Sequence, residues 1–218
     1  MYKTKKWGVI LLALFFSLFD VFLVKVMAPW LKPMQLMAFV TFSKLIFFKL
    51  IQTKVPLPKL SERGWDWQKF FKAVGIHLLM IIATVAYQGI MLYFRGSELI
   101  LENQTALESQ LEGSSKLLLF IVLVILVPIF EEILYRGIII NYIGSMEKYS
   151  VVISSLIFGL AHIQVASGST ALLQVVPYAI YGLSLALIYY KTKDLKYSII
   201  AHMCQNAFAL YVMLGGGF

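Results

Sequence analysis

Two adjacent carboxylates interrupt an apolar stretch of this chain, in the run Phe130-Glu131-Glu132-Ile133-Leu134-Tyr135-Arg136. The run follows the apolar residues 117–128 and precedes three consecutive isoleucines at 138–140. A charged group deep in a bilayer costs roughly 2.5–3.5 kcal/mol on insertion scales. Ionisable residues inside such a segment therefore indicate a functional site, and the question is which groups meet them.

The spacing of these residues gives them different roles. Glu132 and Arg136 are four residues apart, so on a helix they share a face and can form an ion pair. Glu131 lies about 100° around the helix from Glu132. We therefore expect Glu132 to pair with Arg136, which leaves Glu131 available for chemistry.

Further polar residues interrupt the later apolar segments. His162 follows Phe158-Gly159, and His202 and Asn206 are four residues apart, so that both can face one cavity. The chain has only three histidines, and we interpret the third, His77, as a structural contact between helices. Ser154 and Ser155 are likewise interpreted as hydrogen-bonding groups between helices rather than as nucleophiles.

Carboxylate, imidazole and amide groups from three segments can activate water. Burial of a glutamate favours proton uptake, so Glu131 can act as a general base, and His162 can hold the same water. His202 and Asn206 can donate hydrogen bonds to the oxyanion that forms when water attacks a carbonyl. Glu131, His162 and His202 could instead bind Zn²⁺, because imidazole and carboxylate are usual zinc ligands. Both interpretations are compatible with these residue types.

The composition predicts a membrane protein. Of the 218 residues, 60% are hydrophobic and 14% are charged, whereas soluble domains have about 45–50% apolar and about 25% charged residues. The net charge of +8 lies mainly at segment ends, which is typical of membrane topology and does not favour nucleic-acid binding. The one cysteine, Cys204, excludes an intrachain disulfide and a cysteine-based metal cluster.

We predict an all-α bundle with about seven transmembrane helices, since each span needs about 20 mainly apolar residues. The chain is read as a single membrane domain, 1–218, in which 1–115 carries helices without a motif and 116–218 forms the core. The N-terminal stretch resembles a signal peptide, but we interpret it as a retained first helix because Asp20 and Lys25 interrupt it. The predicted helices cover residues 7–27, 34–51, 73–94, 116 to beyond 136, 149–165, 171–190 and 197–214.

The basic residues predict a cytoplasmic N-terminus and an outer C-terminus. In this orientation the inner positions hold the basic residues of 3–6, 54–72, 136, 148 and 191–196, and the outer positions hold Lys32, Arg95 and Lys116. If the fourth helix continues to Gly144, Glu131 lies about 20 Å from its end, level with His162. His202 is expected closer to the surface, about 9 Å beyond Lys196.

The core resembles the CAAX prenyl protease and bacteriocin-processing (CPBP) family of intramembrane proteases. Its three motifs, E-E-x-x-x-R, F-x-x-x-H and H-x-x-x-N, read here as Glu131-Glu132-Ile-Leu-Tyr-Arg136, Phe158-Gly-Leu-Ala-His162 and His202-Met-Cys-Gln-Asn206. The resemblance implies that Glu131 and His162 position the attacking water and that His202 and Asn206 stabilise the oxyanion. Glu132, Arg136 and Phe158 would support the site.

The resemblance also implies an integral protein of the bacterial cytoplasmic membrane that cleaves a membrane-associated, prenylated or bacteriocin-like peptide. Members are commonly labelled metalloproteases, although a glutamate-dependent mechanism without metal is also argued. They often have eight spans, whereas about seven are predicted here. Two other functions fit the composition, a non-catalytic immunity or scaffold protein and a proton-coupled transporter, although the chain shows no repeat symmetry of the kind typical of transporters.

Overall fold

The computed structural model describes residues 30–54, 64–96, 115–141, 148–163 and 170–215, with the single residues Phe15, Val26, Met27, Leu101, Thr105 and Glu108. Within these residues the regular secondary structure is helical, without a strand. The predicted all-α class is therefore confirmed for the described part. The predicted first helix, 7–27, falls almost wholly outside it.

Each other predicted helix is present, with its ends shifted by a few residues. The fourth helix is continuous and includes two π-helical segments, η1 and η2, which are wider than an α-helix. The helices are α2 (Pro33–Lys54), α3 (Trp67–Arg95), α5 (Lys116–Leu119), η1 (Phe120–Leu126), α6 (Val127–Glu132), η2 (Ile133–Ile140), α8 (Lys148–His162), α9 (Ala171–Thr192) and α10 (Leu195–Met213).

The fourth helix, 116–140, continues beyond Arg136, as predicted. At the end of η1, the Val127 N–H bonds to the Val122 carbonyl, five residues back. In this register the next carbonyl, that of Leu123, would accept from residue 128, which is proline and has no N–H. The helix thus carries a carbonyl that needs a partner from elsewhere.

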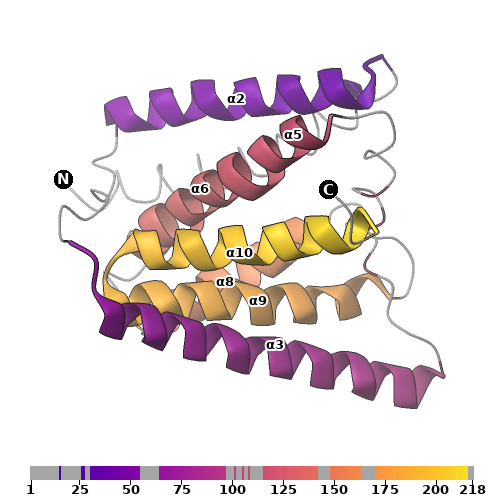
Figure 1. Ribbon diagram of the computed structural model, residues 1–218, viewed down its shortest axis with the longest axis vertical. Coiled ribbons are helices and arrows are strands. Elements are labelled where there is room, and N and C mark those ends of the chain that lie inside the picture. Colours follow the sequence, from indigo (N-terminus) through magenta and orange to yellow (C-terminus); the bar gives the residue numbers. More distant parts are fainter. Residues whose placement is uncertain are drawn as a thin grey trace.

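Successive described helices run in alternating directions through the bundle (Figure 1). Helices α9 and α10 are joined by a short turn, in which Lys193 adopts the left-handed conformation with φ 55°. The Asp194 carboxylate then accepts the Lys196 N–H and caps α10. This tight connection makes α9 and α10 antiparallel neighbours.

Two glycines allow α8 and α9 to pack closely. A Cβ on Gly159 would lie 2.9 Å from the Val175 carbonyl oxygen, and a Cβ on Gly182 would lie 3.1 Å from the Phe158 side chain. Small residues at such contacts are typical of membrane helices, whose backbones approach closely. The close approach brings Phe158 and His162 of α8 next to α9.

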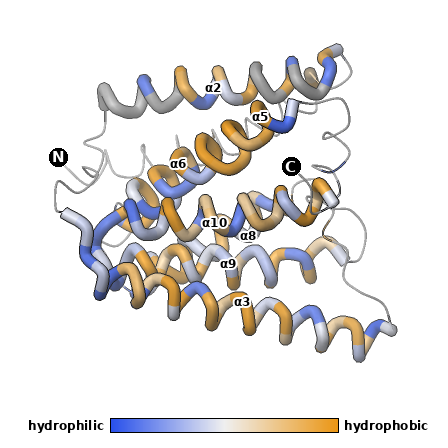
Figure 2. The backbone as a smooth tube through the Cα atoms, in the orientation of Figure 1, coloured by the Kyte–Doolittle hydropathy of each residue, from blue (hydrophilic) through white to orange (hydrophobic). Residues whose placement is uncertain are grey.

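The outer surface of the bundle is apolar. On α3, Leu79, Ile82 and Val85 are exposed by 64–65%, whereas the charged Glu132 and Arg136 are fully buried. Figure 2 shows this apolar character along α3 and the central helices. An apolar exterior around buried charge is the arrangement expected of a protein surrounded by lipid.

Three of the described helices are long and apolar enough to cross a membrane, and α8 is shorter. The three are Trp67–Arg95, Lys116–Ile140 and Ala171–Thr192, and the shorter apolar helix is Lys148–His162. These helices support an integral membrane protein. The count of about seven spans and the cytoplasmic N-terminus stay predictions.

His77 has the structural role that the sequence predicted. Its Nδ1 lies 3.0 Å from the Ser184 hydroxyl on α9, and its Nε2 lies 3.2 Å from Gln205 Oε1 on α10. With the proton on Nε2, the ring donates to Gln205 and accepts from Ser184. His77 therefore joins α3, from the part of the chain without a motif, to the core.

Replacing His77 with Phe should lower the stability of the folded protein. Hydrogen bonds between membrane helices contribute about 0.6 kcal/mol on average and up to about 1.7, so losing two should cost about 1–2 kcal/mol. The expected result is a lower thermal unfolding midpoint in detergent. Loss of activity with an unchanged midpoint would instead indicate a role in the chemistry.

Candidate active site

A buried ion pair lies at the base of the site. Arg136 Nη1 lies 3.0 Å from Glu132 Oε1, and both side chains are fully buried. Arg136 Nη2 donates to the Gly182 carbonyl on α9 at 2.7 Å, and its guanidinium lies 4.9 Å from the centre of the Phe158 ring. The predicted partnership of Glu132 and Arg136 is confirmed, and it fixes the fourth helix against α8 and α9.

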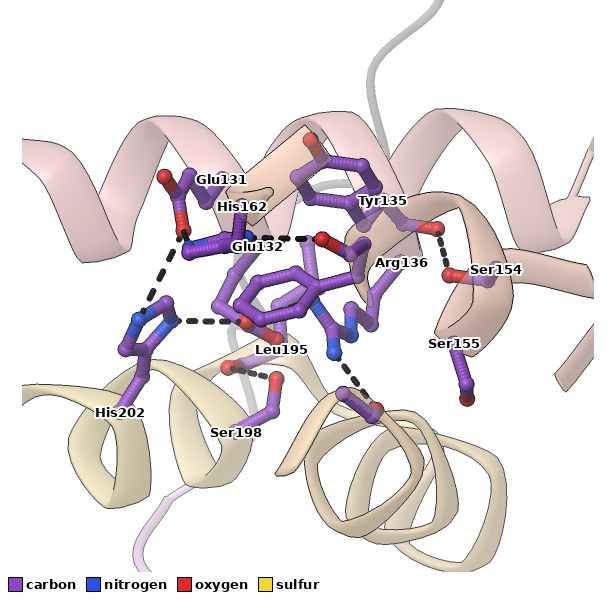
Figure 3. A network of polar contacts seen from close by, with 12 residues as sticks. Glu131, Glu132, Tyr135, Arg136, Ser154, Ser155, His162, Leu195, Ser198 and His202 are labelled. Atoms are coloured by element: carbon purple, nitrogen blue, oxygen red, sulfur yellow. Dashed lines mark hydrogen bonds and ion pairs between the residues drawn. The ribbon is translucent and has the colours of Figure 1, made fainter. Parts of the chain in front are cut away.

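The same carboxylate orients His202. The His202 Nδ1 lies 3.0 Å from Glu132 Oε1, and because a carboxylate accepts, Nδ1 carries the proton. The opposite ring nitrogen, Nε2, faces Glu131 at 3.7 Å. Arg136, Glu132 and His202 thus form a chain of contacts that sets the direction of the imidazole (Figure 3).

His162 is oriented by its own helix and by two aromatic rings. Its Nδ1 donates to the Phe158 carbonyl at 2.7 Å. The ring stacks on Phe158 at 4.2 Å and on Tyr178 at 5.0 Å between centroids. The remaining nitrogen, Nε2, lies 4.0 Å from Glu131 Oε2. Phe158 therefore positions His162 with its backbone and its ring.

Glu131 is the point at which the two imidazoles meet. Its Oε2 faces both Nε2 atoms and is buried without a hydrogen-bond partner among the described residues. The side chains of Glu131 and His162 are exposed by 18% and 20%, whereas His202 is exposed by 2%. The site is therefore accessible from the side of Glu131 and His162.

These distances leave room for a bridging water. At 3.7 and 4.0 Å the contacts are longer than direct hydrogen bonds, and polar contacts of that length are commonly bridged by water. Each ring nitrogen that faces Glu131 is an acceptor in its neutral form, because the other nitrogen carries the proton. A water molecule has two hydrogens, so it can donate hydrogen bonds to two of these three acceptors, such as Glu131 Oε2 and His162 Nε2.

Depth estimates from the sequence were partly wrong. Glu131 and His162 lie level, as a long fourth helix predicted. His202 was expected nearer the surface, yet it reaches the same point. Helix α10 begins at Leu195, two residues earlier than predicted. Helices in a bundle are also inclined to one another, so residue counts from their ends do not give a common depth.

Asn206 contacts the fourth helix. Its Nδ2 donates to the Leu123 carbonyl at 2.8 Å, the carbonyl that loses its helical partner at Pro128. Asn206 therefore satisfies a backbone group that would otherwise be costly in lipid. This structural role was not foreseen, and Pro128, eight residues before Arg136, was the signal that could have revealed it. Stabilisation of the oxyanion by Asn206 stays a prediction.

The two serines have structural roles. The Ser154 hydroxyl donates to the Tyr135 carbonyl on the fourth helix at 2.9 Å. The Ser155 hydroxyl donates to the Val151 carbonyl of its own helix at 2.7 Å. Ser154 thus confirms the predicted contact between helices, whereas Ser155 bonds within α8.

Sequence reasoning missed the tyrosines of α9. Tyr178 stacks on His162, and the Tyr181 ring packs against Phe158 and His202 at 5.9 and 5.5 Å between centroids. The two are three residues apart and share a helix face. The spacing Tyr-x-x-Tyr-Gly is visible in the sequence, but tyrosines in apolar segments are usually packing residues.

A zinc site was one interpretation of Glu131, His162 and His202. Zinc ligands lie about 2.0–2.2 Å from the ion, so donor atoms in a tetrahedral site are about 3.3–3.5 Å apart. The separations here are wider, 3.7 and 4.0 Å. Across the described ranges, no three His, Cys, Asp or Glu side chains are arranged to hold a metal ion. The residues do not fit a preformed metal site.

Comparisons with known proteins agree with the motifs. Residues 113–208 match the family described as type II CAAX prenyl endopeptidase, Rce1-like. The chain is similar to YdiL of Bacillus subtilis (strain 168), a candidate membrane peptidase, with 32% identity over 99 residues. The match covers 44% of this chain and 38% of that relative. No solved structure matches the chain. The segment 113–208, which contains all three motifs, therefore resembles the CAAX-protease-like membrane proteins, and the chain matches well under half the length of this relative.

Proposed function

We propose that this protein is an intramembrane endopeptidase in which Glu131 activates the water that cleaves a peptide bond. The observation that supports this most directly is the meeting of Glu131 Oε2 with the Nε2 atoms of His162 and His202, from three helices, inside an apolar bundle. A carboxylate oxygen, Glu131 Oε2, without a hydrogen-bond partner among the described residues and beside two oriented imidazoles, has the arrangement of a general base with its water-binding partners.

The reaction begins with a water held between Glu131 and His162. As the water oxygen bonds to the carbonyl carbon, Glu131 takes one of its protons and the carbonyl oxygen becomes an oxyanion. When the C–N bond breaks, the proton on Glu131 passes to the leaving nitrogen. Glu131 thereby returns to its ionised form. The products are a peptide with a new amine and a peptide with a new carboxylic acid, which keeps the second proton of the water until it releases it to solvent.

His202 and Asn206 are proposed to stabilise the oxyanion. His202 can donate from Nε2 only in its doubly protonated form, because Nδ1 already donates to Glu132. Glu132 would stabilise that imidazolium by its charge. Asn206 has a second N–H besides the one that donates to Leu123. Electrostatic stabilisation of the oxyanion is commonly the largest single contribution to catalysis of acyl transfer.

The substrate is proposed to be a membrane-associated peptide, which includes prenylated and bacteriocin-like peptides. The apolar exterior supports a location in the bilayer. Because Glu131 and His162 are only partly exposed, we expect the substrate to enter as an extended segment. The family described for residues 113–208 acts on CAAX prenyl proteins, which supports this substrate class. The bacterial relative supports a location in the bacterial cytoplasmic membrane.

Comparative peptide analysis tests this proposal. Membranes from cells that produce the wild-type protein should contain cleavage products absent from cells that produce Glu131→Gln at the same level. Glutamine keeps the size of the side chain and removes the base. Identical peptide profiles, with both proteins inserted, would contradict the proposed function.

Chelation tests whether the activity needs a metal. Because the candidate ligands are not arranged as a metal site, we expect the purified protein to keep its activity in a strong chelator. Metal analysis should find less than one zinc per chain. Loss of activity that Zn²⁺ restores would contradict the metal-free mechanism and would assign Glu131, His162 and His202 as ligands.

A further inference from the structure

The side chains described so far at this site offer few hydrogen-bond donors for an oxyanion. In their neutral forms, His162 and His202 present an acceptor nitrogen toward Glu131, which is itself an acceptor. Asn206 uses one of its two N–H groups on the Leu123 carbonyl. A reaction that passes through an oxyanion needs preorganised donors. A donor that requires no prior protonation would therefore complete the site.

Tyr181 of α9 supplies such a group. Its hydroxyl is buried and has no hydrogen-bond partner among the described residues. A buried hydroxyl without a partner costs roughly 1–3 kcal/mol, so most are paired with protein or water. A hydroxyl that is unpaired in the free protein, beside the site, is suited to bind a group that arrives with the substrate.

The surroundings of Tyr181 place it at the site. Its ring lies edge-on to His202, with centroids 5.5 Å apart at 84°, and packs on Phe158. The ring of Tyr181 therefore packs directly against His202, whose Nε2 faces Glu131 Oε2 at 3.7 Å.

The ring of Tyr181 is held in place from several sides. Arg136 bonds to the carbonyl of the next residue, Gly182, and so fixes α9 at this position. The His77 ring also packs against the ring of Tyr181, with centroids 5.8 Å apart. A rigid ring with an unpaired hydroxyl is preorganised, which is the property that makes a donor effective in a transition state.

We propose that Tyr181 is a further catalytic residue, whose hydroxyl donates a hydrogen bond to the oxyanion formed on the substrate carbonyl. This inference rests on the proposed function, since it needs the same hydrolysis at Glu131. The hydroxyl keeps its proton throughout, so the proton transfers at Glu131 are unchanged. Tyr181 thereby adds a neutral donor beside His202.

The variant Tyr181→Phe tests this inference, because it removes only the hydroxyl. The turnover number should fall by about 10²–10³-fold, the usual effect of removing one oxyanion donor, while KM stays the same. The thermal midpoint should stay the same or rise, since the variant loses a buried polar group that had no partner.

Tyr197→Phe is a matched control. Its hydroxyl donates to the Asp66 carbonyl at 3.1 Å and accepts from the Asp66 N–H at 2.8 Å, at the end of the bundle. This variant should lose stability and keep its turnover number. The two tyrosines should therefore show opposite patterns in the same pair of measurements.

Affinity for a transition-state mimic gives a second readout. A phosphinic peptide carries an anionic oxygen where the oxyanion would form, so Tyr181→Phe should weaken its binding by a factor comparable to the loss of turnover. Binding of the corresponding uncleaved amide to a Glu131→Gln background should not change when Tyr181→Phe is added.

The outcomes separate the two proposals. Wild-type turnover and wild-type phosphinate affinity in Tyr181→Phe would overturn this inference, as would a loss of activity that follows a fall in the thermal midpoint. Neither result would affect the proposed function if Glu131→Gln is inactive. Full activity of Glu131→Gln would overturn the proposed function itself.

Discussion

The Glu131→Gln variant should hydrolyse peptide about 10²–10⁴-fold more slowly than the wild-type protein, the range typical for loss of a general base. Glutamine has nearly the same shape but cannot take a proton from water. Its amide can still contact the two imidazoles that lie 3.7 and 4.0 Å from Glu131 Oε2. The protein should therefore fold and bind substrate normally.

Steady-state kinetics on purified protein in a lipid nanodisc measure this effect. The turnover number should fall while KM changes little, because the base acts only in the chemical step. His162→Gln should also lower turnover, since it removes a partner of the same water. A Glu131→Gln variant that keeps the wild-type turnover number would show that another group activates the nucleophile.

Arg136→Met should strongly destabilise the protein. Arg136 and Glu132 are both fully buried and 3.0 Å apart, and removal of one partner from a buried ion pair costs about 3–5 kcal/mol. The Gly182 carbonyl would lose its donor as well. The expected result is a large fall in thermal midpoint and in yield after detergent extraction.

The double variant Glu132→Gln with Arg136→Met separates charge from packing. It leaves no unpaired buried charge in the pair, so much of the lost stability should return. Its activity should stay low, because His202 would lose the carboxylate that bonds to Nδ1. An Arg136→Met protein with the wild-type thermal midpoint would show that the ion pair contributes little to the fold.

Helical periodicity predicted the parts of the site that depend on one helix. The pairing of Glu132 with Arg136 follows from their spacing on a helix face, and the release of Glu131 follows from the 100° rotation between neighbours. The apolar composition likewise predicted the helices. These features can be predicted without knowing which helices pack against each other.

Features that depend on packing between helices were harder to predict. His202 was placed too near the surface because helix inclination is set by side chains on neighbouring helices. Tyr181 was missed because a tyrosine in an apolar segment is usually packing, and only the fold shows its hydroxyl without a partner. The contact of Asn206 with Leu123 depends on the register of η1, which residue types alone do not give.

The bond between Asn206 and Leu123 limits how the bundle can open. If α10 moved away from η1, the Leu123 carbonyl would face hydrocarbon without a donor, which costs several kcal/mol in a bilayer. We therefore expect α10 and η1 to stay together when a peptide enters, and we expect the peptide to reach the site beside Glu131 and His162, which are partly exposed, whereas His202 is not.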